Sequence, residues 1–275
     1  MRFMKKNKHT NAYFISGAAI TVLFIILMLI GLIHTPYDPN AMNGAEKFSS
    51  PSFSHIMGTD NFGRDIFSRV LKGISMTGLV AVSTVAIGGS IGTITGAVTG
   101  YYGGLVDEIV MRINDALNGF PSILIALIIV SIIGPGKYNV ILALGILFIP
   151  SFARIVRSEY ISLKERDFVK SARLMGAGNM RIIFRHIFPN IRPTLFVTAT
   201  IGFNNAVLAE AGLSYLGIGI QPPDASLGSM LSDAQSYLFT APWYAIMPGM
   251  TIVLFVLGFS LLAEGIRIEA EREQN

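Results

Sequence analysis

The chain has 275 residues, of which 52% are hydrophobic and only 14% are charged, and its formal net charge is +4. Soluble domains carry about a quarter charged residues, so this composition indicates an integral membrane protein with little mass outside the bilayer. The absence of cysteine excludes disulfides, thiolate metal sites and cysteine nucleophiles.

The first hydrophobic run covers residues 12–33 and follows the basic stretch MRFMKKNKHT. It resembles a signal peptide, but it is too long for the apolar part of a signal and no small-x-small cleavage site follows it. At 1.5 Å per residue the run extends about 33 Å, enough to cross the hydrocarbon core. We predict an uncleaved first membrane helix.

Six membrane spans are predicted in total, at residues 12–33, 75–100, 117–134, 139–158, 192–219 and 244–263. Lysine and arginine gather before the first span and after the fourth, whereas residues 219–243 contain neither. The positive-inside rule therefore places both termini and the loop after the fourth span in the cytoplasm. The basic residues that decide this orientation are Arg2, Lys5, Lys6, Lys8, Arg154, Arg157, Lys164, Arg166, Lys170, Arg173, Arg181, Arg185 and Arg192.

The first outer loop ends in GTDNFGRDIFSRVLKG (58–73). Asp60 is placed to cap a turn, and Ile66, Val70 and Ile74 recur at helical spacing. We predict an amphipathic helix that lies against the outer surface before the second span. A solvated linker is the alternative.

The second span carries one glycine every four residues, at Gly88, Gly92, Gly96 and Gly100. Positions four residues apart share a helix face, so this strip allows another helix to approach closely. Each glycine costs about 1 kcal/mol of helix propensity relative to alanine in water. A tight, sliding interface within a moving bundle and ordinary helix packing both explain the strip.

Residues 106–117 place apolar side chains at helical spacing, with charged residues between them. This pattern predicts an amphipathic helix, and the third span then extends below the membrane. Its polar face is either solvated or part of a cytoplasmic docking surface.

The segment from Asp167 to Pro193, between the fourth and fifth spans, carries the strongest functional pattern. Asp167 is placed to serve as the N-cap of a short helix. Phe168, Ala172 and Met175 share one face of this helix, while Lys170 and Arg173 are displaced from it.

The short helix is followed by a break and a second amphipathic run. Gly176 and Gly178 predict the end of the helix. The second run covers residues 180–188, and Pro189 is expected to end it.

The same segment resembles the cytoplasmic pattern EAA-x3-G-x9-I-x-L-P of ABC importer permeases. Lys170, Ser171 and Ala172 stand at the EAA positions, Gly176 follows after three residues, and Pro189 lies thirteen further on. The departures are Lys170 and Ser171 in place of Glu and Ala, and His186 and Phe188 in place of Ile and Leu.

Blocks along nearly the whole chain narrow the resemblance to the dipeptide/oligopeptide/nickel branch, and to its second (C-type) permease subunit. These blocks are PYDPN (36–40), GTDNFGRDIFSR (58–69), ERDFVKSARLMGAG (165–178), FRHIFPN (184–190), EAGLSYLGIGIQPP (210–223) and PWYAIMPG (242–249). Where that branch has Pro-Ser-Trp-Gly after the QPP block, this chain has Ala225-Ser226-Leu227-Gly228.

The resemblance implies an all-α membrane protein with six transmembrane helices, the type I ABC importer permease fold and a cytoplasmic coupling helix. Residues 1–74 would form the tail, first span and outer loop, residues 75–265 the core with the coupling segment 167–190, and residues 266–275 a cytoplasmic tail. The coupling helix would sit in a groove on an ATP-binding subunit and tilt the bundle between inward-open and outward-open states. An incidental interfacial helix is the alternative.

The implied partners are a second homologous permease subunit, two ATP-binding subunits, an extracytoplasmic substrate-binding protein and the bilayer of a bacterial cell membrane, with no nucleic acid. No GxxxxGK[ST] loop occurs in the chain, so ATP and magnesium would be bound by the partner subunits. The chain is therefore expected to be a transport subunit, without a cofactor of its own and not an enzyme. The ATPase-coupling residues implied by the resemblance are Asp167, Phe168, Lys170, Ser171, Ala172, Arg173, Met175, Gly176 and Pro189.

Few polar residues fall inside the predicted spans. Asn204 and Asn205 lie about 17 Å along the fifth span from Pro193, near the middle of the membrane, and Glu210 lies about 26 Å along it, near the outer surface. These residues line a pathway for a peptide backbone or a metal chelate, or they hydrogen-bond neighbouring helices. The dispersed histidines show no metal-ligand spacing.

Other classes of membrane protein lack support. An ion-coupled secondary transporter needs an ionisable midplane site or equivalent broken helices in two repeats, and a channel needs a filter or a ring of charge. A membrane enzyme needs clustered catalytic residues at one depth. Only the permease interpretation also explains residues 167–193. The cargo is left open between small peptides and a nickel-type metal chelate.

Overall fold

The computed structural model describes residues 12–274, and every regular element in this part of the chain is helical. Five helices are long: α1 (Ala12–Ile33), α2 (Ile66–Tyr102), α5 (Lys137–Lys164), α8 (Phe188–Tyr215) and α10 (Pro242–Gln274). The shorter elements are η1 (Gly44–Glu46), α3 (Gly104–Asn118), α4 (Ser122–Ile133), α6 (Asp167–Leu174), α7 (Asn179–Arg181), η2 (Ile182–Ile187), α9 (Leu227–Ala234) and η3 (Gln235–Tyr237). The basic residues between Arg2 and Lys8, used above for orientation, lie outside the described residues.

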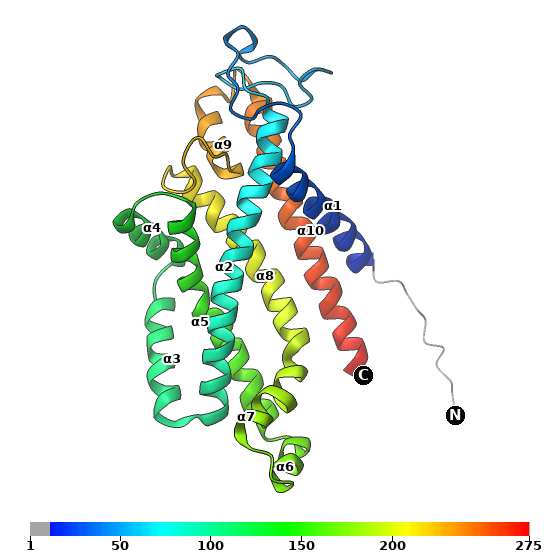
Figure 1. The fold of residues 1–275 in the computed structure, drawn as a ribbon, viewed down its shortest axis with the longest axis vertical. Coiled ribbons are helices and arrows are strands. Elements are labelled where there is room, and N and C mark those ends of the chain that lie inside the picture. Colours follow the sequence, from blue (N-terminus) through cyan, green and yellow to red (C-terminus); the bar gives the residue numbers. More distant parts are fainter. Residues whose placement is uncertain (1–11, 275) are drawn as a thin grey trace, which may run out of the picture.

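The long helices form an elongated bundle (Figure 1). Helices α2, α5 and α8 run through its centre, α1 and α10 lie side by side along one flank, and α3 and α4 lie along the other. Residues 34–65 and α9 gather at one end, which we call the loop end. Helices α6 and α7 lie at the opposite end, which we call the α6 end.

Four of the described helices, α1, α2, α5 and α10, are long and apolar enough to cross a membrane. Helices α3 and α4 meet the same requirement only as a pair, so the described chain holds four such spans, or five with this pair. Helix α8 corresponds to the predicted fifth span, but it is not among the helices that are apolar enough. It carries polar residues such as Asn204, Asn205 and Glu210. Several apolar spans make this a multi-pass membrane protein, while the predicted number of six is not reached by these criteria.

The predicted surface helix before the second span is wrong, because residues 66–74 are the first turns of α2 itself. Asp65 caps this helix, its Oδ2 accepting a hydrogen bond from the Ser68 amide at 2.7 Å. Ile66, Val70 and Ile74 are at most 2% exposed and belong to the main hydrophobic core. The solvated-linker alternative fails for the same reason.

The third predicted span is also wrong as a continuous helix, because α3 and α4 meet at an angle of 88°. Pro121 precedes α4 and has no N–H to continue the hydrogen bonds of a helix. The predicted amphipathic helix exists as α3, but part of its polar face contacts α5. Asp107 forms two hydrogen bonds with Arg157, at 2.5 and 2.6 Å, and Asp115 forms one with Arg154 at 2.8 Å.

The glycine strip of α2 lies directly against α5. A Cβ atom built on Gly88, Gly92, Gly96 or Gly100 would lie 2.6, 2.6, 2.4 or 2.7 Å from the nearest atom of α5. Real Cβ atoms do not approach other heavy atoms so closely, so the two backbones are in contact along more than three helical turns.

Candidate coupling segment and translocation face

The chain at the α6 end folds into the predicted short helix, but its first turn differs from the prediction. Arg166 is the capping position, with extended backbone and no capping side-chain hydrogen bond, and Asp167 is the first residue inside α6. The prediction of Asp167 as N-cap is therefore wrong by one position. Its carboxylate still lies in the first turn, where the positive end of the helix dipole favours an anion.

The two faces of α6 differ sharply in exposure. Val169 and Ala172 are 0% and 2% exposed, and Val169 joins a hydrophobic cluster with residues of α2, α5, η2 and α8. By contrast, Phe168, Leu174 and Met175 are 41%, 90% and 81% exposed. Within the predicted set of Phe168, Ala172 and Met175, only Ala172 is buried, because the buried stripe follows the i, i+3 pair Val169 and Ala172.

Helix α6 ends in a Schellman motif centred on Gly176. Gly176 has a φ of +83°, which side-chain-bearing residues rarely adopt. The Ala177 amide donates to the Ala172 carbonyl oxygen at 3.0 Å, and the Gly176 amide donates to the Arg173 carbonyl oxygen at 3.0 Å. These bonds satisfy the last carbonyl groups of the helix and fix the direction of the chain that follows.

Pro189 does not end the second amphipathic run, contrary to the prediction. Helix α7 continues through the π-helical turn η2 into α8, and Pro189 occupies the first turn of α8. The π-helical turn lies just before Pro189, and across it the Phe188 amide donates to the Ile183 carbonyl oxygen. The run from residue 179 therefore joins α6 directly to a 28-residue helix.

Hydrogen bonds mount the coupling segment on α2 and α5. The Tyr101 hydroxyl donates to Asn179 Oδ1 at 2.8 Å and accepts from Arg173 at 3.4 Å. The Tyr160 hydroxyl of α5 donates to the Ile183 carbonyl oxygen of η2 at 3.2 Å. The exposed residues Lys170 and Ser171 lie on the same helix, so the segment presents an exposed surface on a firmly held base.

The polar residues of α8 point to different surroundings. Asn204 is 8% exposed and donates from Nδ2 to Ser260 Oγ of α10 at 2.8 Å, while its Oδ1 has no hydrogen-bond partner among the described residues. Asn205 is exposed. Glu210 is 0% exposed and bonds to Thr77 and Ser214. Sequence reasoning grouped the three residues, but the structure does not place Glu210 on an exposed surface.

Asn205 borders two open cavities, one on each side of α8. The first has a volume of about 390 Å³ and lies between α8, α5 and the α3–α4 bend. Its polar lining residues are Asn118, Ser122, Ser151, Thr198 and Asn205. The second has a volume of about 610 Å³ and lies between α8 and α10, where Asn204, Asn205 and Ser260 line it. The first cavity thus combines apolar walls with uncharged hydrogen-bonding groups, which suits neutral amide groups.

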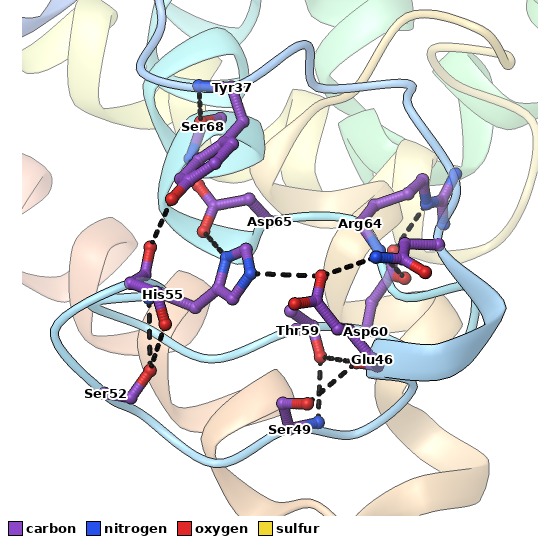
Figure 2. A network of polar contacts seen from close by, with 12 residues as sticks. Tyr37, Glu46, Ser49, Ser52, His55, Thr59, Asp60, Arg64, Asp65 and Ser68 are labelled. Carbon is purple, nitrogen blue, oxygen red and sulfur yellow. Dashed lines mark hydrogen bonds and ion pairs between the residues drawn. The ribbon is translucent and has the colours of Figure 1, made fainter.

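The loop end holds a buried polar network that sequence reasoning missed. Figure 2 shows the His55 ring between two carboxylates: Nδ1 lies 2.8 Å from Asp65 Oδ1 and Nε2 lies 3.5 Å from Glu46 Oε2. As predicted, Asp60 caps a turn, its Oδ1 accepting from the amides of Phe62 and Arg64. The outer loop is therefore a folded cap over α2.

Two arginines connect this cap to α9. Arg64 Nε lies 2.5 Å from Asp60 Oδ2, and guanidinium nitrogens of Arg64 and Arg69 lie 3.8 and 4.0 Å from Asp233 Oδ2. Burial raises the pKa of Asp233 above its usual value, although both arginines act in the opposite direction. Within residues 12–274, no group of three His, Asp or Glu side chains is arranged to hold a metal ion.

Comparisons with known proteins place the chain in a family. A family model described as "Binding-protein-dependent transport system inner membrane component" matches residues 88–267. The dipeptide transport system permease protein DppC of Alkalihalophilus pseudofirmus is 40% identical over 96% of this chain and 86% of the relative. The glutathione transport system permease protein GsiD of Escherichia coli is 41% identical over 91% of this chain and 84% of the relative.

A solved structure agrees with the fold. The MetNI methionine ABC transporter in an inward-facing conformation matches with a TM-score of 0.59 and 20% identity, over 74% of this chain and 95% of the matched chain. At this identity the likeness supports the type I permease fold alone. The resemblance found in the sequence is confirmed by the family model and the relatives. The chain therefore belongs to the family of binding-protein-dependent transport system inner membrane components, as a permease subunit of the ABC importer type.

Proposed function

We propose that this chain forms half of the translocation pathway of an ABC importer for short peptides, and that partner ATP-binding subunits drive it through α6. The exposed apolar tip of α6 is the observation that carries the proposal. Phe168, Leu174 and Met175 are exposed on a helix whose other face is fixed by Val169 and Ala172. Exposed apolar patches on a protein surface mark sites of interaction with other proteins or with membranes.

The cargo is inferred from the relatives and from the lining of the first cavity. The relatives are named for dipeptide and glutathione transport, and glutathione is itself a short peptide. The cavity beside Asn205 offers Asn, Ser and Thr side chains on an apolar wall, which would bind backbone amides without selecting for charge. We therefore favour a short peptide over a nickel-type chelate.

The arrangement in the membrane completes the proposal. Six spans would cross the bilayer, with α8 as the polar one, because its polar residues face neighbouring helices or the pathway. The α6 end and both chain termini would face the cytoplasm, and the loop end would face the substrate-binding protein. Residues 75–265 would form the core that pairs with a second, homologous permease subunit and contacts two ATP-binding subunits.

Peptide uptake tests this proposal. The chain is expressed with its partner subunits in a host that lacks its own dipeptide and glutathione importers, and uptake of labelled dipeptide is measured. We expect uptake in the wild type and its loss in Met175→Glu, since replacing an interface anchor costs about 2 kcal/mol or more. Met175→Leu keeps an apolar tip and should transport. Normal uptake by Met175→Glu would refute coupling through α6.

A further inference from the structure

Glu210 is a fully buried carboxylate in α8, less than two helical turns before this helix ends at Tyr215. It is 0% exposed, and the groups that interact with it in the described chain are hydroxyls, with no cation among them. A buried carboxylate without hydrogen bonds carries a large desolvation cost. The hydrogen bonds that Glu210 accepts therefore offset part of this desolvation cost.

Two relays of hydrogen bonds end on the two oxygens of Glu210. The Ile220 amide donates to Ser214 Oγ at 3.0 Å, and Ser214 Oγ donates to Glu210 Oε1 at 2.6 Å. The Leu227 amide donates to Thr77 Oγ1 at 3.4 Å, and Thr77 Oγ1 donates to Glu210 Oε2 at 2.7 Å. In each relay the hydroxyl oxygen accepts a hydrogen bond from a backbone amide, and the hydroxyl donates its own proton to the carboxylate.

The two amides belong to the connection from α8 to α9 and to its end. Ile220 lies within this connection, five residues after the last residue of α8, and Leu227 is the first residue of α9. Ser226, the residue before Leu227, forms a capping box with Ser229 at the start of α9. The positive end of α9 thus faces a carboxylate, which is the favourable direction for a helix dipole.

Close packing leaves α9 little freedom beside this carboxylate. A Cβ atom built on Gly228 of α9 would lie 2.3 Å from the Ala211 carbonyl oxygen of α8. On its other side, Asp233 of α9 faces Arg64 of the outer cap and Arg69 of α2. Helix α9 is therefore held between Glu210 and these two arginines.

We propose that Glu210 is a positioning residue that fixes α9 to α8 and α2, so that movement of α8 at the α6 end is carried to the outer end of the pathway. Helix α8 is continuous from η2 to Tyr215, a length of about 42 Å, and Glu210 lies near its far end. A rigid helix with fixed contacts at both ends is a physical route for such coupling. This inference rests on the proposed function for its transport consequence.

The test uses the complete transporter in liposomes and makes two measurements. Hydrogen exchange reports how firmly residues 227–234 are held, and the number of peptides taken up per ATP hydrolysed reports coupling. Glu210→Gln keeps the size of the side chain but replaces one acceptor oxygen with an NH2 group that cannot accept the hydroxyl proton. Thr77→Val removes one relay and retains the carboxylate.

We expect both variants to assemble, to exchange the α9 amides about tenfold faster or more, and to import fewer peptides per ATP. Thr84→Val is the matched control, because Thr84 is a buried threonine of α2 whose hydroxyl has no hydrogen-bond partner among the described residues. It should resemble the wild type in both measurements.

Unchanged α9 exchange in Glu210→Gln and Thr77→Val would overturn the anchoring role. Faster exchange with a normal ratio of peptide to ATP would overturn the coupling role. A wild-type transporter that imports no peptide would instead reject the proposed function, while the exchange measurement would still decide whether Glu210 anchors α9.

Discussion

Gly96 on α2 and Ala153 on α5 lie so close together that a Cβ atom built on Gly96 would stand 2.4 Å from the Ala153 carbonyl oxygen. A larger residue at Gly96 must therefore push α5 away. We expect Gly96→Leu to lower stability by about 1–3 kcal/mol, the usual cost of overpacking. Thermal unfolding of the purified complex in detergent measures the loss.

Gly89→Ala is the control for this substitution. A Cβ atom at Gly89 would meet the Phe152 ring at 3.3 Å, and this ring borders two cavities into which it can move. We expect nearly normal stability for Gly89→Ala. Equal stability of Gly96→Leu and the wild type would mean that the backbones are not in contact.

Gly176 ends α6 in a backbone conformation that other residues adopt at a cost. Its φ is +83°, and a left-handed conformation costs side-chain-bearing residues about 1–2 kcal/mol. We expect Gly176→Ala to loosen the end of α6 and to reduce uptake. Gly178→Ala is the matched control, since Gly178 has a φ of −70° and open space around it. Faster exchange over residues 167–177 in Gly176→Ala, but not in Gly178→Ala, would support this prediction.

The Asp107–Arg157 pair holds α3 on α5 through two hydrogen bonds, and its side chains are 16% and 31% exposed. A double-mutant cycle with Asp107→Asn and Arg157→Met should give a coupling energy of about 1.5–3 kcal/mol. The exposed pair Glu108–Arg112 serves as the control, with a coupling energy of about 0.5 kcal/mol. Similar coupling energies for both pairs would contradict a role of the first pair in holding α3.

Asp233 gives the stability a definite dependence on pH. Because burial raises the pKa of Asp233 in the folded protein, the folded state binds this proton more tightly than the unfolded chain. The contribution of Asp233 to the free energy of unfolding therefore becomes more favourable as pH falls through the raised pKa of the folded state. This change is complete below the pKa that Asp233 has in the unfolded chain. Relative to Asp233→Asn, the wild type should gain stability between neutral pH and pH 4. A difference that is constant over this range would show that Asp233 has its ordinary pKa.

Local patterns predicted those features whose cause lies within a few neighbouring residues. The short helix α6, its end at Gly176 and the capped turn at Asp60 all follow from side-chain or backbone chemistry that acts over one turn. The family resemblance also follows from such blocks, since each block is contiguous in sequence. The amphipathic helix at residues 106–117 belongs to the same class.

Features that depend on distant residues were missed. Pattern alone gave no reason for Ile66, Val70 and Ile74 to be buried, because the cluster that they join is completed by residues of α1, α8, α9 and α10. The relay through Thr77 to Glu210 joins residues more than a hundred positions apart in the chain, and the His55 network depends on the folding of the whole outer loop. The i, i+3 spacing of Val169 and Ala172 is visible in the sequence, but the sequence also offers the bulkier Phe168 and Met175 as a candidate apolar face.

Site-specific photo-cross-linking tests the coupling proposal most directly. A photoreactive amino acid is placed at Met175, which is 81% exposed on α6, and at Tyr138, which is 74% exposed near the other end of the molecule. The complex is irradiated in membranes, and adducts are identified by mass spectrometry. The account predicts an adduct between position 175 and an ATP-binding subunit, and none with that subunit from position 138. No adduct from position 175, in a complex that still imports peptide, would contradict it.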